Sequence, residues 1–166
     1  MEIIKSEVPN RDVFKLNSSD IVFDGTLVLD LGNKNCVIER IRSTHTDDST
    51  IVYVPDEKAI FLGDSFYGTT KNSLFHYKKS HLEPMIEDIQ KFDASHFIAG
   101  HESICDIEEM DLFWKQLRSA SKAVNSTSLD ASLETFEKEN GRQPIGDELF
   151  FIKAFVNDQI LHSEER

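Results

Sequence analysis

The sequence predicts an α+β fold, with a sheet-rich part in residues 1–104 and a helical part in residues 105–166. In the first part, short runs of alternating apolar and polar residues are separated by turn residues, which is typical of strands. In the second part, apolar residues recur every three or four positions, which is typical of helices. Neither an internal repeat nor a linker separates the two parts, so we expect a single domain.

The first strands are expected to form an antiparallel meander. Short strands are expected at residues 12–14 and 21–23. Residues 26–31 alternate, with a leucine at every second position, and the turn sequence Gly-Asn-Lys-Asn follows. The chain then returns as a strand over residues 36–42, because such a turn favours a hairpin.

A second hairpin is expected over residues 50–62. Its two strands, at 50–54 and 59–62, are separated by the turn Pro-Asp-Glu-Lys. A hairpin returns the chain to the level at which it started. His45, just before the first strand, is therefore expected close to Asp64, just after the second.

A further histidine follows another apolar strand. Residues 97–100 read Phe-Ile-Ala-Gly and lead into His101. A helix over residues 83–92 precedes this strand, with an apolar stripe and a proline in its first turn. Residues 68–73 are expected to form a loop beside the strand ends.

The helical part contains three expected helices. They cover residues 107–124, a shorter segment that carries Leu129 to Phe136 and stops at Gly141, and residues 144–161. The last helix is apolar nearly all round. Such a helix is either buried on two sides or lies in an interface.

His45, Asp64 and His101 together form a candidate metal site, because imidazole and carboxylate groups are ligands that zinc accepts. Asp47 and Asp48 are interpreted as turn residues. The alternative is that one of them accepts a hydrogen bond from a side chain that binds the metal. Three of the other histidines are interpreted as surface or supporting residues: His76, His81 and His96.

This order of motifs resembles the second half of metallo-β-lactamase-fold hydrolases, over residues 9–104. The resemblance implies a partial αββα sandwich in which the chain holds the second half, followed by a helical C-terminal extension. It also implies roles for three residues. His45 would bind a first metal, Asp64 would bridge two metals, and His101 would bind the second.

The sequence departs from that family in one respect. The family's principal ligand motif, His-x-His-x-Asp-His, should lie upstream, yet the first histidine of this chain is His45. The chain thus resembles a truncated metallo-β-lactamase domain. Three ligands cannot hold two metal ions, although they could hold a single zinc as a two-histidine, one-carboxylate set. We expect the isolated chain to be inactive.

Three interpretations remain open. The chain is a metal-dependent hydrolase completed by another chain, a non-catalytic remnant or interaction module, or a fragment of a longer enzyme. A missing layer would leave apolar strand faces uncovered, so we expect a homodimer or a chain that supplies the missing half. The last helix is expected to take part, with Phe150, Phe151 and Phe155 as anchors.

The composition limits the partners and the location. A formal net charge of -12 disfavours nucleic acid and anionic membranes, because both attract basic proteins. No stretch approaches the length of a membrane span. Cys36 and Cys105 are too few for a disulfide framework, which makes a reducing cytoplasm the expected location.

Overall fold

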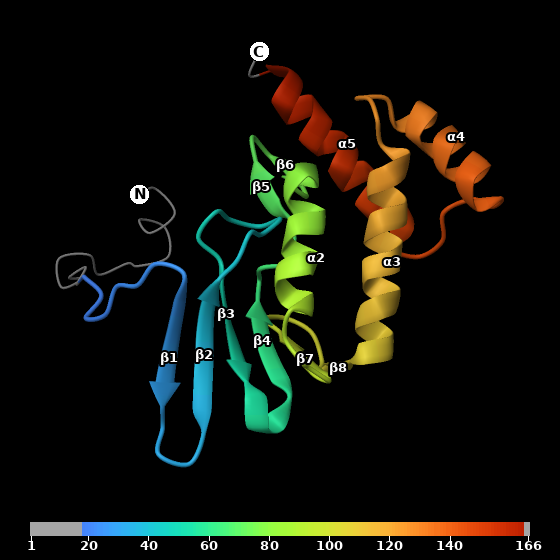
Figure 1. Ribbon diagram of the computed structural model, residues 1–166. Coiled ribbons are helices and arrows are strands. Elements are labelled where there is room, and N and C mark those ends of the chain that lie inside the picture. The colour runs from blue at the N-terminus through green and yellow to red at the C-terminus, as the bar shows by residue number, and fades with distance from the viewer. Residues whose placement is uncertain (1–17, 165–166) are drawn as a thin grey trace, which may run out of the picture.

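The computed structural model describes residues 18–164, which form a mixed α+β structure (Figure 1). One sheet has six strands in the order β1-β2-β3-β4-β7-β8, and β5 pairs with β6 in a separate hairpin. The strands are β1 (Thr26–Asp30), β2 (Asn35–Arg40), β3 (Thr50–Val54), β4 (Ala59–Gly63), β5 (Thr69–Lys71), β6 (Leu74–His76), β7 (His96–Ala99) and β8 (Cys105–Asp106). The helices are α2 (Leu82–Gln90), α3 (Ile107–Ala123), α4 (Leu129–Asn140) and α5 (Glu148–Glu164).

Strands β1 to β4 form the expected antiparallel meander. The chain then leaves the sheet, forms the β5-β6 hairpin and helix α2, and returns as β7, which runs parallel to β4. Parallel neighbours need such a crossover, because a tight turn reverses the chain direction. As a result, the ends of β4 and β7 lie at the same edge of the sheet.

One face of the sheet is covered by helices. Residues directly opposite one another in the register share a face, and one row across the strands contains Tyr53, Ile60 and Phe97. These three side chains are buried in a core to which α2 and α3 contribute Met85 and Trp114. In Figure 1 the helices gather at the upper right, with α2 next to the sheet.

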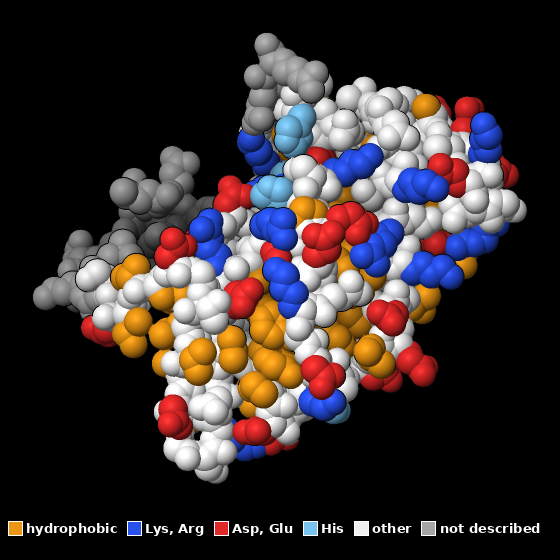
Figure 2. All heavy atoms as spheres, viewed as in Figure 1, with side chains coloured by type: hydrophobic (Ala, Val, Ile, Leu, Met, Phe, Trp, Pro, Cys, Tyr) orange, Lys and Arg blue, Asp and Glu red, His pale blue; other side chains and the backbone are white. Residues whose placement is uncertain are grey.

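The opposite face carries a second apolar row. Its five members are direct neighbours across five strands: Leu27, Ile38, Val52, Phe61 and Ile98. None of them belongs to the buried core within residues 18–164, and Phe61 is 46% exposed. We call this row the open face. Figure 2, in the same view as Figure 1, shows hydrophobic side chains over the lower part of the strands, with charged side chains around them and over the helices.

Helix α5 packs on its own chain. Phe151 and Phe155 are buried, and both rings contact Tyr77, which follows β6. The prediction that these two phenylalanines anchor an interface is therefore wrong, because α3 and the β5-β6 hairpin already cover them. Phe150 is 48% exposed, although its ring contacts Phe75.

Two sequence-based expectations about strands need correction, and one lies outside the described residues. The strand expected at residues 12–14 falls outside residues 18–164. No strand forms at 21–23, where Ile21 and Val22 are exposed. The loop expected at 68–73 contains strand β5, because Asn72 and Ser73 adopt positive φ values and make a tight hairpin turn.

None of the described helices is long and apolar enough to cross a membrane.

Candidate functional site

Asp64 and His101 lie together at the sheet edge where the parallel strands end. Asp64 follows β4 directly, and His101 follows β7 after one glycine. The Nε2 atom of His101 lies 3.3 Å from Oδ1 of Asp64. The backbone N–H of Gly100 donates to the carbonyl of Gly63 at 2.9 Å, which fixes the two strand exits side by side.

Gly100 leaves the space that the Asp64 carboxylate occupies. A Cβ atom at this position would lie 2.3 Å from Oδ1 of Asp64, well inside contact distance. No side chain larger than hydrogen fits here without moving the carboxylate. Gly100 is thus a requirement for the Asp64–His101 contact.

His45 is held by the segment that follows Asp64. Its Nδ1 donates to the carbonyl oxygen of Gly68 at 2.7 Å. Because a carbonyl only accepts, this bond assigns the ring proton to Nδ1 and leaves the Nε2 lone pair free when the ring is neutral. The preceding residues are tied to the same segment, since Ser43 Oγ donates to the Ser65 carbonyl at 2.5 Å.

His45 and Asp64 line a common hollow of about 400 Å³, together with Asp48. The structure therefore pairs Asp64 with His101 by contact and with His45 across a hollow. Within residues 18–164, however, no group of three or more His, Cys, Asp or Glu side chains is arranged to hold a metal ion. The assignment of His45, Asp64 and His101 as metal ligands stays a prediction.

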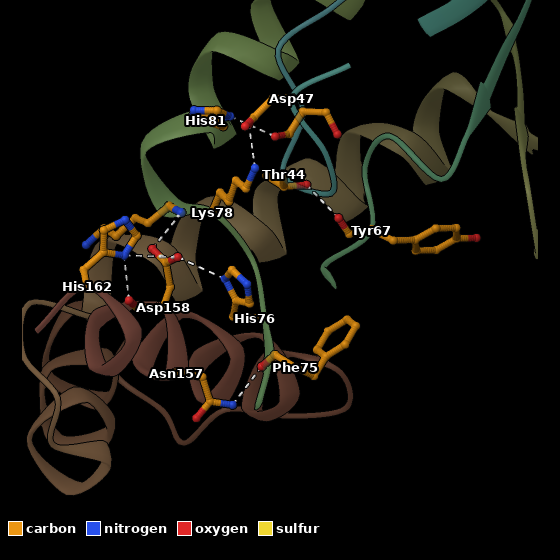
Figure 3. Close-up of polar contacts among 12 residues, drawn as sticks. Thr44, Asp47, Tyr67, Phe75, His76, Lys78, His81, Asn157, Asp158 and His162 are labelled. Carbon is orange, nitrogen blue, oxygen red and sulfur yellow. Dashed lines mark hydrogen bonds and ion pairs between the residues drawn. The ribbon is translucent and has the colours of Figure 1, made fainter. Parts of the chain in front are cut away.

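Asp47 has a partner other than the candidate ligands. Its Oδ1 accepts from Nζ of Lys78 at 2.6 Å (Figure 3), and this hydrogen bond is the largest cause of the lowered pKa of Asp47. Asp47 and Asp48 do lie in a turn, as predicted. The alternative, a hydrogen bond from one of them to a metal ligand, stays a prediction.

Tyr67 is a site residue that the sequence did not indicate. Its ring lies beside that of His101, with 5.7 Å between centroids, and its backbone carbonyl accepts from Thr44 Oγ1 (Figure 3). The pKa of the Tyr67 phenol is raised, first by burial and then by the charge of Glu102. The phenol is therefore neutral at physiological pH. Its position three residues after Asp64 was the only available signal.

A buried pair supports the hairpin beside the site. His76 and Asp158 are both buried, and Nδ1 of His76 lies 3.1 Å from Oδ1 of Asp158. The other carboxylate oxygen accepts from the backbone N–H of Lys79 at 3.1 Å. Figure 3 shows Asp158 between His76 and His162. This pair joins α5 to the β5-β6 hairpin and so fixes the segment that carries Gly68.

Comparison with known proteins shows which fold the chain has, through solved structures alone. No family model matches the chain, and no curated protein matches it. Among solved structures, a histidine mutant of the flavo di-iron protein from Thermotoga maritima matches with a TM-score of 0.51 at 12% identity, over 92% of this chain and 48% of that chain. A double mutant of a sec-alkyl sulfatase gives a TM-score of 0.51 at 12% identity, over 84% of this chain and 24% of that one. This is the metallo-β-lactamase fold.

The chain holds only part of the metallo-β-lactamase fold. It covers 48% of the flavo di-iron protein and 24% of the sulfatase, less than two thirds of either. The chain is also similar to an archaeal metallo-β-lactamase superfamily protein from Sulfolobus tokodaii, with a TM-score of 0.49 at 16% identity, over 96% of this chain and 61% of that chain. The partial αββα sandwich expected from the sequence is confirmed at the level of the fold.

Proposed function

We propose that this chain is one half of a metal-dependent hydrolase with the metallo-β-lactamase fold. It would supply His45, Asp64 and His101, while a second polypeptide supplies the remaining ligands and the second sheet. The open face carries this proposal. A sheet with helices on one side and a five-residue apolar row on the other is suited to face another sheet, as in a sandwich.

The donor groups suit zinc, but their arrangement does not hold it. Two imidazoles and one carboxylate are chemically appropriate ligands. A zinc ion in a catalytic site takes about three protein ligands that converge on one point. Here the Asp64 carboxylate contacts His101 directly, and the described residues contain no converging set of three. The proposal therefore assigns the completion of the site to the partner.

A second copy of this chain does not complete the enzyme. Two copies of this chain would cover both open faces, and we expect them to do so when no other partner is present. A second copy brings no His-x-His-x-Asp-His motif, however, because the sequence contains none. Homodimerisation would bury the apolar row without supplying the missing ligands.

The free thiols of Cys36 and Cys105 are compatible with the proposed reducing cytoplasm.

The alternative function is a non-catalytic interaction module. It is favoured by the same open face, together with the lack of a converging ligand set in the part that the structure describes. The two functions differ in what the partner must contain. A hydrolase needs metal ligands from its partner, whereas an interaction module needs only an apolar surface of matching shape.

The test compares the purified chain with and without added zinc. Metal content is measured by mass spectrometry, and hydrolysis is measured on ester, thioester and β-lactam substrates with a His45→Ala variant as control. We expect the isolated chain to match the control on every substrate. Activity that survives purification and disappears in the His45, Asp64 and His101 variants would show that one chain suffices.

A further inference from the structure

A cavity of about 380 Å³ lies beside the candidate site, between the segment after β4, the loop before β8 and the first half of α3. Most of its wall is apolar. The apolar lining residues are Phe66, Tyr67, Ile104, Cys105, Met110, Leu112 and Phe113. The wall includes Tyr67, whose ring also contacts His101, so the cavity and the Asp64–His101 pair share one side chain.

The cavity presents apolar surface to solvent. Ile104 is 63% exposed and Leu112 is 57% exposed, although both line the cavity. Large apolar side chains left in water at the rim of a hollow are typical of ligand sites. Deeper in the wall, the ring of Phe66 lies 5.2 Å from that of Phe113 and at nearly a right angle to it. These two rings form an aromatic inner surface.

The charged groups around this cavity are all acidic. Glu102, Glu109 and Asp147 line it, and no Lys, Arg or His does so among the described residues. Two of these carboxylates also affect the ionisation of a thiol in the cavity wall. The pKa of the Cys105 thiol is raised by burial first, and next by the negative charges of Glu109 and Glu102. A cation is therefore favoured at this rim and an anion disfavoured.

We propose that this cavity binds a small ligand with an aromatic body and an ammonium group. The body packs on Phe66 and Phe113 in the apolar interior, and the ammonium group meets the carboxylates at the rim. Aromatic faces add attraction for a cation. This inference goes beyond the hydrolase proposal, because binding here requires neither a metal nor a second chain. In a completed hydrolase, the same cavity would place a cationic substrate beside Asp64 and His101.

The probe is 4-phenylbutylamine, and its matched control is 4-phenylbutyrate, which has the same body and the opposite charge. Binding to the full chain is measured by NMR titration and calorimetry without metal. We expect the amine to bind at least about tenfold more tightly than the acid, since the three carboxylates attract the ammonium group and repel the carboxylate of the control. Added salt should narrow this difference, because it screens exposed charges.

Two variants separate the cavity from the overall acidity of the protein. Glu102→Gln removes a rim charge and is expected to weaken amine binding about threefold. Glu134→Gln removes an exposed charge from α4, outside the cavity, and should leave binding unchanged. Equal binding of amine and acid, equal losses in both variants, or no binding of the amine at millimolar concentration would each overturn the proposal. These binding measurements are made without metal. Their outcome therefore does not decide the hydrolase proposal, which has its own test.

Discussion

The two faces of the six-stranded sheet are built from the same strands and similar residues, yet only one is buried. Ile51 and Ile60 on the helix-covered face are fully buried, whereas Phe61, between Ile60 and Leu62 in sequence, is 46% exposed. Alternation along a strand sends successive side chains to opposite faces. Apolar residues on both faces therefore indicate a sheet that takes a packing partner on each face.

Comparing the two faces shows how much folding free energy the chain gains by packing on itself. Burying one large apolar side chain contributes about 1.5–3 kcal/mol. The covered face obtains this from α2 and α3, whereas the open face obtains it only when another surface packs on it. Variants that treat the two faces separately can measure the difference.

The largest effect is expected from a pair of matched substitutions. Ile51→Ala, on the covered face, should lower the free energy of unfolding by about 3 kcal/mol, because it leaves a cavity in a packed core. Ile38→Ala, on the adjacent strand and the open face, should cost less than about 1 kcal/mol in the dilute chain. Urea unfolding measures both. Equal losses would mean that the open face is covered even at low concentration.

A second variant weakens the attachment of α2 to the covered face. Asp88 of α2 accepts hydrogen bonds from Nε and Nη2 of Arg42 at 2.9 and 2.8 Å. Arg42→Gln should lower the free energy of unfolding at pH 7, because the largely buried Asp88 carboxylate keeps only Lys91 as a charged partner. Arg40→Gln is the control, because its partner Asp24 is 95% exposed and 3.7 Å away. A comparable loss in the control would show that the effect is only one of net charge.

The same pair gives a pH dependence with a definite sign. Hydrogen bonds from Arg42 are the largest cause of the lowered pKa of Asp88 in the folded protein. Folding thus favours the charged carboxylate, so its contribution is complete above the ordinary Asp pKa of about 4 and is lost as the pH falls below it. The loss of stability between pH 5 and pH 2 should be smaller in Arg42→Gln than in the natural chain.

A third variant tests what covers the open face. Val52→Lys places an ammonium group in the centre of the row, where a packed partner would have to bury it. Self-association should weaken by about 2 kcal/mol, while Ile145→Lys, at a residue that is 62% exposed elsewhere, should leave it unchanged. Sedimentation velocity at micromolar concentrations measures both. A strictly monomeric natural chain would remove the homodimer from the proposal.

The smallest effect is expected at the sheet edge that carries the candidate ligands. Gly100→Ala should displace the Asp64 carboxylate from His101, because the added Cβ would lie 2.3 Å from Oδ1. Gly32→Ala is the control: its Cβ meets no atom within 4 Å, and although the positive φ strains the turn, the His101 ring signals should stay unchanged. The NMR signals of the His101 ring report both. Unchanged His101 signals in Gly100→Ala would show that the contact does not require the glycine.

Local patterns made much of this fold predictable. The Pro-Asp-Glu-Lys turn fixed the hairpin to within one residue, since β3 and β4 cover Thr50–Val54 and Ala59–Gly63. The start of α5 was harder to predict. The expected helix began at residue 144, but the Glu148 carboxylate accepts from Arg142 and from the Ile145 N–H, which holds the preceding segment as a loop.

Contacts between distant segments explain what the sequence did not indicate. The contact between Asp64 and His101 could be predicted, because each residue follows an apolar strand and a glycine. Tyr67 beside His101, and the buried His76–Asp158 pair, depend on elements that meet only in the folded chain. A histidine 82 positions away from its carboxylate partner carries no local mark of that partnership.

The local pairing of strands β1 to β4 has a consequence for the order of folding. Each of these strands pairs with its neighbour in sequence, and contacts of this kind form early because little chain entropy is lost in closing short loops. We expect β7 to join later, because its pairing with β4 requires the longer crossover to close. On this order the meander forms with neither face covered, and the packing of α2 is what first makes the two faces different.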